Sequence, residues 1–364
     1  MTMTIVHVET GRNLYGGALQ VLYLLRGLTD RQCRNVLVCP AGSAVAIEAQ
    51  GSADKVYEIP IRGDLDFAFI GRLKSIINEE QADLVHLHSR RGADVLGGVA
   101  ARLAGVRCIC SRRVDNPEFP LIAKLKYRLY DKVITISSGI RRILIDEGVQ
   151  EDKVICVHSA VDTEKYGQPA DNKWFEKEFK LPPGSRVMGM IAQLIPRKGH
   201  RHLFAALPGI IERHPDIRVF LFGKGPMERE LRLQIEKQGL DKHVKLLGFR
   251  DDLHRVLPNL YAVIHPADME GLGVSLLQAA AAGVPLIGTC VGGIPEIVHN
   301  EQNGLLIEPQ NVDQLRTALL RLLEDDNTAH DWGLAGRRIV ENEFSIDAMV
   351  EGNLRVYQSI LEER

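Results

Sequence analysis

The residues best suited to chemistry lie in the segment 268–279. Glu270 follows a short apolar run, residues 263–265, that is typical of a buried strand. Gly271 and Gly273 come next and leave backbone N–H groups accessible at the start of a helix rich in small residues. A carboxylate in this place could simply cap the helix, but the two glycines favour a ligand that approaches the backbone closely. We therefore expect Glu270 to face a bound ligand.

Two further glycine-containing turns carry positive charge. Arg197-Lys198-Gly199 follows the predicted strand 187–191, and Gly223-Lys224-Gly225-Pro226 closes the predicted strand 219–222. An arginine fork and a lysine point charge beside a helix start suit a diphosphate. Each segment could also be an ordinary turn, a solvated basic one in the first case and a strand-to-helix turn with an early proline in the second.

Near the N-terminus, Gly16-Gly17 separates the predicted strand 5–8 from a helix with leucines at helical spacing. Paired glycines let a ligand reach the backbone, although the spacing is not that of a GxGxxG dinucleotide loop and a tight turn is also possible. His86 and His88 alternate along the predicted strand 84–87, so both face one side of a sheet, where a histidine can be packed, solvated or functional.

No metal site is expected. Asp64-Leu65-Asp66 matches a DxD pattern that can bind a metal ion, but Asp66 is better placed to cap a predicted helix, residues 69–77. The six cysteines form no CxxC pair and have no spacing typical of zinc ligands, which favours a reducing compartment.

The elements that must position these residues alternate regularly. Short apolar runs, continuous as in parallel strands covered on both faces, are separated by helical stretches of roughly 10–15 residues, which is typical of doubly wound α/β sheets. The predicted strands are Ile5–Val8, Val36–Cys39, Val56–Ile59, Leu84–Leu87, Arg107–Cys110, Val133–Ile136, Val154–Val157, Val187–Ile191, Val219–Phe222, Val244–Leu247, Val263–His265, Leu286–Gly288 and Leu305–Ile307.

These elements divide into two similar halves around a polar, proline-containing segment, residues 162–183. We expect an N-terminal Rossmann-like domain over residues 1–168, joined by a C-terminal helix over residues 346–364, and a C-terminal Rossmann-like domain over residues 169–345. Ligands bind open α/β sheets at the carboxyl ends of their strands, so the expected fold is α/β with two doubly wound domains that face a central cleft.

Composition excludes several classes of protein. The 364-residue chain is 45% hydrophobic and carries a net charge of −2, which argues against disorder and against a nucleic-acid partner. No basic segment precedes the first predicted strand, and no apolar run approaches the ~20 residues that span a bilayer. These features predict a cytoplasmic protein.

In this order, the motifs resemble those of the retaining GT-B glycosyltransferases of family 4, also called glycosyl transferases group 1. The resemblance covers nearly the whole chain. It implies two Rossmann-like domains and transfer of a sugar from a nucleotide-sugar donor, with retention of configuration and without a cofactor or metal. It is carried by Gly16-Gly17, Val85-His86-Leu87-His88, Ile136-Ser137-Ser138, Val161-Asp162, Arg197-Lys198-Gly199, Gly223-Lys224-Gly225-Pro226, Gly248-Phe249-Arg250-Asp251-Asp252, His265-Pro266, Glu270-Gly271 and Gly292-Gly293-Ile294-Pro295-Glu296.

The resemblance also implies roles for matching residues. Arg197 and Lys198 match the family's diphosphate-binding pair and Glu270 matches an acid that contacts the donor sugar, so these three are the expected catalytic residues. The expected donor site comprises Gly16, Gly17, Arg197, Lys198, Gly223, Arg250, Glu270, Gly271, Leu272, Gly273, Val274 and Gln278.

Three positions depart from the family pattern. Gln278 replaces a second acid that holds the ribose hydroxyls, and its amide can still hydrogen-bond a diol but without a charge. Ala192-Gln193 replaces a Gly-Arg pair, which leaves Arg197 as the second cation. The family's histidine after the fifth strand is missing, so the acceptor-side candidates are His88, Arg112, Arg113 and Asp115.

We expect a retaining, metal-independent glycosyltransferase that acts on a glycan or lipid-linked acceptor in cell-envelope, lipopolysaccharide or other polysaccharide biosynthesis. Lys198, Arg197 and helix N-termini would stabilise the charge on the departing nucleoside diphosphate. No dedicated nucleophile is evident, which favours front-face substitution over a covalent intermediate. A nucleotide-sugar epimerase of the same fold and a non-catalytic nucleotide-sugar-binding protein are the alternatives.

A basic region suggests contact with a membrane. Residues 84–142 hold twelve Lys and Arg and four acids, a local excess of eight positive charges on a chain of net charge −2. An apolar stripe within this region can lie on an anionic bilayer or pack on the N-terminal sheet. The first possibility predicts peripheral association with the inner face of the plasma membrane. The stripe consists of Leu121, Ile122, Leu125 and Leu129, flanked by Lys124, Lys126 and Arg128.

Overall fold

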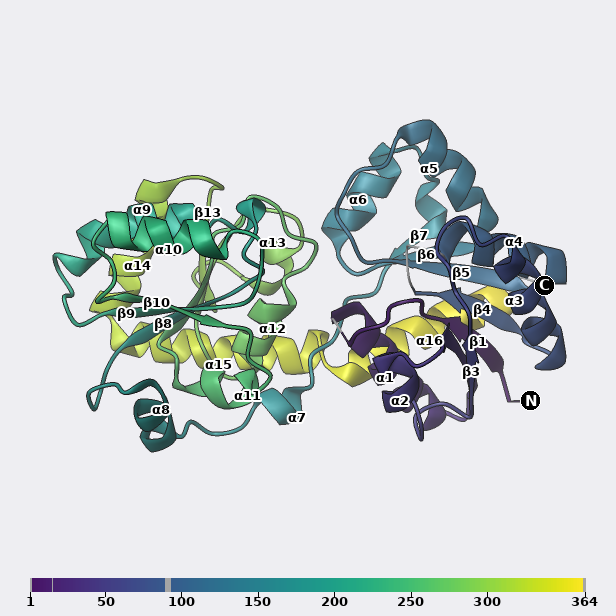
Figure 1. Ribbon diagram of the computed structural model, residues 1–364, viewed down its shortest axis with the longest axis horizontal. Coiled ribbons are helices and arrows are strands. Elements are labelled where there is room, and N and C mark those ends of the chain that lie inside the picture. The colour runs from purple at the N-terminus through teal and green to yellow at the C-terminus, as the bar shows by residue number, and fades with distance from the viewer. Residues whose placement is uncertain (1, 15, 89–92, 363–364) are drawn as a thin grey trace. The chain divides into compact units, whose positions relative to one another are not determined.

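The computed structural model describes residues 2–14, 16–88 and 93–362, and the chain divides into two compact units (Figure 1). The first comprises Met1–Ala160 and Ile346–Arg364, and the second comprises Val161–Ser345. The division falls before the expected boundary at 168/169. Val161 donates a backbone hydrogen bond of 2.9 Å to Phe344 and pairs with Ser345, which ties the connecting segment to the second unit.

The first unit is built on a parallel sheet. The described residues form seven strands in the order β3-β2-β1-β4-β5-β6-β7. Most are fully buried β-branched and aliphatic runs, as the continuous apolar pattern predicts for a sheet with two covered faces. Their bounds are β1 Thr4–Val8, β2 Arg34–Pro40, β3 Lys55–Ile59, β4 Leu84–Leu87, β5 Arg107–Arg112, β6 Lys132–Thr135 and β7 Val154–Cys156.

Helices follow the strands of this sheet, and α16 (Ile346–Glu362), from the far end of the chain, packs against α1 (Gly16–Thr29). Tyr357 and Val350 of α16 are buried with Leu24 and Leu28 of α1 in one hydrophobic cluster. The remaining helices are α2 Ala44–Glu48, α3 Ala68–Glu79, α4 Asp94–Ala104, α5 Pro120–Lys126, η1 Tyr127–Leu129, α6 Ser138–Asp146 and η2 Glu151–Lys153.

The second unit repeats the design with a parallel sheet whose described strands run in the order β10-β9-β8-β11-β12-β13. Their bounds are β8 Val187–Ile191, β9 Arg218–Phe222, β10 Val244–Gly248, β11 Ala262–His265, β12 Leu286–Thr289 and β13 Gly304–Ile307. The helices are α7 Thr163–Tyr166, α8 Asn172–Phe179, η3 Pro196–Lys198, α9 His200–Ile211, α10 Glu228–Lys237, α11 Leu253–Val256, η4 Leu257–Asn259, α12 Val274–Ala281, α13 Ile294–Ile297, α14 Val312–Glu324 and α15 Asp326–Glu343.

Each predicted strand is present, with ends that differ by one or two residues. The expected capping role of Asp66 is wrong. No side chain caps the N-terminus of α3, and Asp66 instead accepts a hydrogen bond from the Arg62 backbone and pairs with Arg72 at 2.6 Å. The arginine competes for the carboxylate, and sequence spacing alone did not reveal that contact.

Strand order reverses at one point in each sheet. In the first unit the reversal lies between β1 and β4, and in the second between β8 and β11. The loops that follow such a pair diverge to opposite faces and leave a crevice at the carboxyl ends, where ligands of doubly wound sheets bind. These two switch points are where the polar residues predicted to be functional should gather.

Candidate active site

An ion pair occupies the switch point of the second unit. Lys198 ends the 3-10 turn η3 after β8, and Glu270 lies in the loop after β11. The Lys198 Nζ and Glu270 Oε2 atoms are 2.5 Å apart, and the two side chains are only 9% and 14% exposed. The fold thus brings together two of the three predicted catalytic residues, which are 72 positions apart in sequence.

A buried histidine completes this cluster. His265, the last residue of β11, places its Nε2 atom 2.6 Å from the same Glu270 oxygen. Burial raises the pKa of Glu270, but the hydrogen bond with His265 and the charge of Lys198 outweigh it and hold that pKa well below its ordinary value. The other carboxylate oxygen accepts the Gly271 N–H at 3.1 Å. Both oxygens of the Glu270 carboxylate therefore accept hydrogen bonds within the protein.

Glycines bring the loops of this cluster into contact. Gly199 has φ +77°, and a Cβ at this position would lie 1.8 Å from the Pro266 carbonyl oxygen. Gly292, in the loop after β12, has φ +55°, and a Cβ there would lie 1.6 Å from the Glu270 carbonyl oxygen. Only glycine fits both positions, because they combine left-handed backbone with backbone contact. These contacts hold Lys198 and Glu270 in place.

The loop after β9 packs in the same way. A Cβ on Gly223 would lie 1.9 Å from the Ala192 carbonyl oxygen, and one on Gly225 would lie 2.3 Å from that of Leu194. The backbone of Leu194 also exchanges hydrogen bonds with this loop. Gly223, predicted to bind the donor, thus has a packing reason to be glycine. Its contact with a ligand stays a prediction.

The remaining predicted site residues of the segment 268–279 follow Glu270 in the loop and in the first two turns of α12. Gly273 has φ +101° and precedes α12, whose N-terminus begins at Val274. Leu272 is buried, whereas Gly271, Val274 and Gln278 are partly exposed. Arg197 is also partly exposed, and its carbonyl accepts the Asp268 N–H at 2.8 Å, which links the loops after β8 and β11. Of these residues, Gly273 lies against the ion pair, since a Cβ on it would be 3.7 Å from the Glu270 Cγ atom.

Arg250 has partners inside the protein. It pairs with Asp252 at 2.6 Å and with Glu178 of α8 at 2.8 Å. The hydrogen bonds to these two carboxylates hold the pKa of its guanidinium above the ordinary value. Both contacts would have to loosen for Arg250 to bind a donor. Its neighbour Phe249 follows β10 and is 61% exposed, and the Lys224 ammonium lies over its ring, 5.5 Å from the ring centroid.

A second group gathers at the switch point of the first unit. His88 follows β4 and is buried, and Arg113 follows β5. Arg113 lies beside Gly17, since a Cβ on Gly17 would be 3.5 Å from its Cδ, whereas a Cβ on Gly16 would meet no described residue within 4 Å. Packing therefore does not explain the glycine at position 16.

The other two acceptor-side candidates differ from this group. Arg112 is buried, pairs with Glu118 at 2.8 Å and donates hydrogen bonds to the carbonyls of Val114 and Asn116. It therefore holds the loop after β5 rather than presenting its charge to an acceptor. Asp115 is buried in that loop.

Sequence reasoning did not place three polar residues in the site. His265 belongs to a motif that carried the resemblance, but only the fold shows that it binds Glu270. His7 and Asn35 lie inside apolar strands, where a histidine or asparagine is usually structural. A signal was present, because buried polar residues need partners and two such residues lie on neighbouring strands.

Comparison with known proteins identifies the family. Residues 171–339 match the family Glycosyl transferases group 1, and residues 15–165 match Glycosyltransferase Family 4. The chain is 31% identical to the Escherichia coli UDP-Gal:alpha-D-GlcNAc-diphosphoundecaprenol alpha-1,3-galactosyltransferase over 70% of this chain and 69% of that protein. The protein is thus a glycosyltransferase of group 1.

Two further proteins are similar to this chain, one in sequence and one in fold. The chain is 33% identical to a GDP-mannose-dependent monoacylated alpha-(1-6)-phosphatidylinositol monomannoside mannosyltransferase of Corynebacterium glutamicum, over 55% of each protein. Its fold matches that of Anabaena HepE, crystallised with UDP, with a TM-score of 0.85 and 20% identity over 98% of this chain and 100% of HepE. The fold is accordingly GT-B.

Proposed function

We propose that this glycosyltransferase moves a sugar from a UDP-sugar to a lipid-linked glycan acceptor, with retention of configuration and without a metal ion. The observation that carries the proposal is the buried Lys198–Glu270–His265 cluster at the switch point of the second unit. The Escherichia coli relative is named for UDP-Gal and a diphosphoundecaprenol acceptor, and HepE was crystallised with UDP, which supports both substrate classes.

The cluster suits a reaction in which charge builds on phosphate. As the bond between the sugar and the nucleoside diphosphate breaks, negative charge moves to the departing phosphate oxygens, and Lys198 and Arg197 stabilise that charge electrostatically. The loops that carry the cations are fixed by backbone contacts, so little reorganisation is needed when the charge develops.

The state of Glu270 supports front-face substitution. Both of its oxygens accept hydrogen bonds, one from Lys198 and His265 and the other from the Gly271 backbone. A carboxylate engaged in this way is a weak nucleophile, so a covalent glycosyl intermediate on Glu270 is disfavoured. Glu270 instead binds a hydroxyl of the donor sugar. The acceptor hydroxyl oxygen attacks the anomeric carbon from the side on which the diphosphate leaves, and its proton passes to the departing phosphate oxygen.

A donor panel tests the proposal. UDP-glucose, UDP-galactose, UDP-N-acetylglucosamine and GDP-mannose are each added to the purified protein, and the donor should raise the melting temperature by mass action. Transfer is then measured with a short-chain GlcNAc-diphospho-lipid. Epimerised sugar after incubation with donor alone would identify an epimerase, and binding without transfer or hydrolysis would identify a non-catalytic binder. Either result would refute the proposal.

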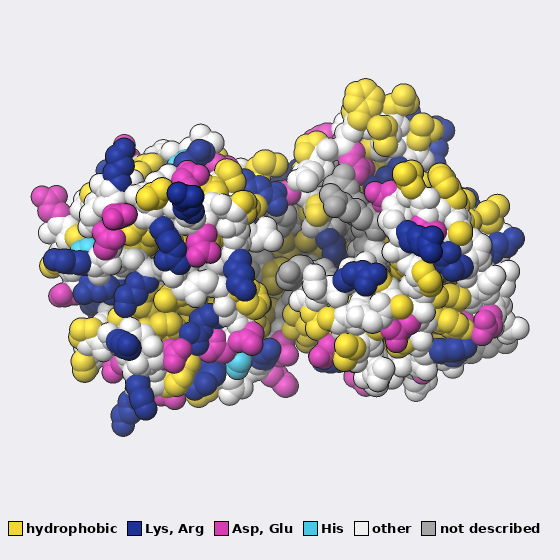
Figure 2. Space-filling view, viewed as in Figure 1, with side chains coloured by type: hydrophobic (Ala, Val, Ile, Leu, Met, Phe, Trp, Pro, Cys, Tyr) yellow, Lys and Arg dark blue, Asp and Glu magenta, His cyan; other side chains and the backbone are white. Residues whose placement is uncertain are grey.

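An exposed apolar face on α5 supports the membrane part of the proposal. Leu121, Ile122 and Leu125 are 61%, 60% and 57% exposed, and Phe119 just before the helix is 68% exposed. Figure 2 shows hydrophobic side chains gathered over this helix, with basic side chains beside them. The alternative that the whole stripe packs on the sheet is wrong, and only Leu129 packs against the core. We place this face on an anionic bilayer at the cytoplasmic side.

The charge around α5 is smaller than the sequence count indicates. The Lys126 side chain is only 9% exposed and pairs with Asp94 at 2.7 Å and with Glu118 at 3.0 Å, so its charge faces inward. Lys124 and Arg128 are exposed and flank the apolar residues. Two more of the twelve Lys and Arg in residues 84–142, Arg90 and Arg91, lie outside the described residues. In the described part of the chain, no helix has the length and apolarity needed to cross a membrane.

A further inference from the structure

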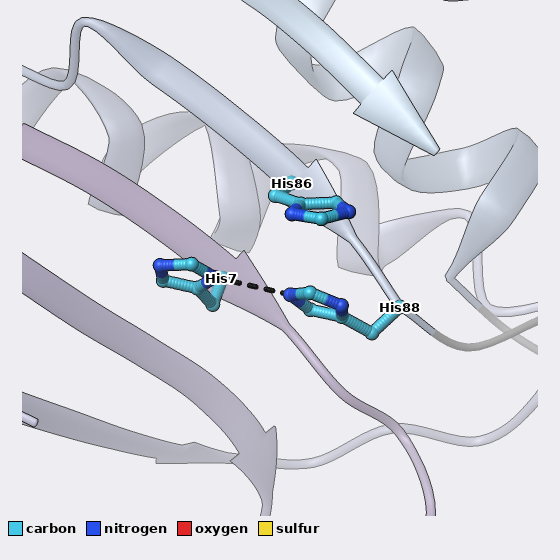
Figure 3. A group of neighbouring side chains, drawn as sticks. All are labelled: His7, His86 and His88. Carbon is cyan, nitrogen blue, oxygen red and sulfur yellow. Dashed lines mark hydrogen bonds between the residues drawn. The ribbon is translucent and has the colours of Figure 1, made fainter. Parts of the chain in front are cut away.

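Three histidines lie together at the switch point of the first unit (Figure 3). His7 on β1 pairs in register with His86 on β4, and His88 follows two positions later, so all three side chains lie on one face of the sheet. Each is at most 3% exposed. The Nδ1 atom of His7 lies 3.0 Å from the Nε2 atom of His88, and the other His7 nitrogen lies 3.2 Å from Asn35 Oδ1.

Asn35 sets the direction of this chain of hydrogen bonds. Its amide nitrogen donates to the Leu25 carbonyl, the Cys33 carbonyl and the Thr29 hydroxyl, at 3.2 to 3.4 Å. Because these contacts fix the amide nitrogen on one side, the amide oxygen must face His7. That oxygen can only accept, so the Nε2 atom of His7 carries the proton.

The proton positions then follow along the chain. Burial lowers the pKa of His7 to about 4, against a smaller opposite effect of its bond to Asn35, so His7 is neutral at pH 7 and its Nδ1 is a lone-pair acceptor. His88 must therefore donate from Nε2. Burial, and then the charges of His86, His7 and Arg113, hold the pKa of His88 well below its ordinary value, so its Nδ1 carries a lone pair.

That final lone pair has no partner among the described residues. The Nδ1 atom of His88 is shielded from solvent and accepts no hydrogen bond. A buried acceptor left in this state costs about 1–3 kcal/mol, and such atoms call for a water, an ion or a functional role. His88 directly follows β4 at the carboxyl edge of the sheet, where a ligand of this unit would bind.

We propose that Asn35 and His7 are positioning residues that hold His88 in the Nε2–H tautomer, so that its Nδ1 atom accepts a hydrogen bond from a hydroxyl of the sugar acceptor. The proposal rests on the proposed transferase function for the identity of the ligand. The tautomer rests on the geometry around Asn35 and on the burial that keeps His7 and His88 neutral, and it does not depend on the proposed function.

Metal binding is the competing use of three neighbouring histidines. The ring nitrogens that would serve as ligands lie within 4.8 Å of one another. However, the His86 and His88 rings are tilted by 39° with their centroids 3.9 Å apart, and both nitrogens of His86 already contact hydroxyls, those of Tyr357 at 2.6 Å and Ser111 at 2.8 Å. Zinc ligands instead converge their lone pairs on one point about 2.0 Å away. The hydrogen-bonded relay fits the cluster better.

Nitrogen NMR of the whole protein, labelled with ¹⁵N-histidine, reads the tautomers directly at pH 7. His7 and His88 should each show a protonated Nε2 and a bare Nδ1, with assignments from loss of signal in His7→Gln and His88→Gln. Addition of a short-chain GlcNAc-diphospho-lipid should shift the His88 Nδ1 resonance. A protonated Nδ1 on His88, a resonance unmoved by the lipid, or displacement of the pattern by stoichiometric Zn²⁺ would overturn the proposal.

Substitution of Asn35 separates positioning from mere stability. Asn35→Leu removes the oxygen acceptor for His7 and should yield mixed His88 tautomers and a kcat/KM about ten- to a hundred-fold lower. Asn353→Leu, a buried asparagine of α16 bonded to the Met349 carbonyl, is the matched control and should leave the tautomers unchanged. An absence of transfer by the wild-type protein would refute the proposed function but not the tautomer.

Discussion

At the scale of single residues, the candidate site is defined by charges that are buried and paired. Sequence motifs predicted Lys198 and Glu270 as functional residues, and the fold brings them together. Arg250 and Arg112 were predicted as ligand-binding cations, yet each is paired with carboxylates within its own unit. A motif shows which residue is present, but its partners come from tertiary contacts such as that between Arg250 and Glu178 of α8.

The first prediction concerns Gln278 in α12. If its side chain faces the ribose hydroxyls, Gln278→Glu restores a charge-assisted hydrogen bond, and the Kd for the UDP-sugar should fall by about three- to ten-fold. Calorimetric titration with the donor from the panel measures this change. A Kd that rises ten-fold or more, with an unchanged melting temperature, would show that the position meets negative charge instead.

At the scale of elements, the sequence predicted the strands well because their apolar runs are continuous, as in strands that are buried on both faces. Loops were predicted less well, since their glycines serve two purposes. Gly199, Gly223 and Gly292 each lie where a Cβ would strike a backbone oxygen. Gly16 has open space around it, and this difference appears only in the folded structure.

The second prediction uses that difference at the start of α1. Gly16→Ala should keep or slightly raise stability, by up to about 1 kcal/mol, because no residue in the described part of the chain lies within 4 Å of the added methyl group. Transfer should nevertheless fall by about ten-fold or more if this backbone approaches a ligand phosphate. Gly71→Ala in α3, also with open space around it, is the control and should leave transfer unchanged. If the two variants transfer sugar at the same rate, Gly16 does not contact the ligand.

The third prediction concerns the apolar face of α5. Leu125→Asp should weaken binding to vesicles that contain phosphatidylglycerol by about ten-fold or more, because one buried leucine contributes about 1.5–3 kcal/mol. The melting temperature should not change, since Leu125 is 57% exposed. Leu233→Asp in α10, also 57% exposed, serves as the control in co-sedimentation. Equal binding of wild-type protein to neutral and anionic vesicles would contradict the proposal that this face binds an anionic bilayer.

At the scale of the whole molecule, two units repeat one plan. Each has a parallel sheet with a single reversal of strand order, and each gathers buried polar residues there, Lys198 and Glu270 in one and His7 and His88 in the other. The sequence predicted both sheets from alternation of elements. It did not predict the histidine relay, because residues 7, 35 and 88 meet only through the register of β1, β2 and β4.

The fourth prediction follows from the buried histidines. Burial lowers the pKa of His7 to about 4 from an unfolded value of about 6.5, and burial likewise lowers that of His200 to about 4. Below pH 6.5 the unfolded chain binds protons at these histidines, whereas the folded chain does not. The free energy of unfolding that these histidines contribute above pH 6.5 is therefore lost as the pH falls towards 4. Each histidine should contribute a loss of about 1.4 kcal/mol per pH unit in this window.

Chemical denaturation at pH 7, 6 and 5 measures this dependence. His7→Gln should make the fall in unfolding free energy shallower, whereas substitution of the exposed His330 by Gln should leave it as in the wild type. Burial raises the pKa of Glu80, but the hydrogen bonds that its carboxylate accepts outweigh this effect and lower that pKa to about 2. The pKa of Glu270 is also well below its ordinary value. The stabilisation that these two carboxylates contribute is therefore lost only below pH 4.5. Stability that rises between pH 6.5 and 5 would contradict the account.

The central claim, that Lys198 stabilises charge on the departing diphosphate, is tested most directly by kcat/KM for sugar transfer in Lys198→Ala. Truncating one member of a buried charge pair costs about 2–5 kcal/mol, so the value should fall roughly 30- to 4,000-fold. Lys237→Ala, which removes an exposed lysine from the end of α10, is the control and should match the wild type. A Lys198→Ala protein with an unchanged melting temperature and near-wild-type kcat/KM would contradict the claim.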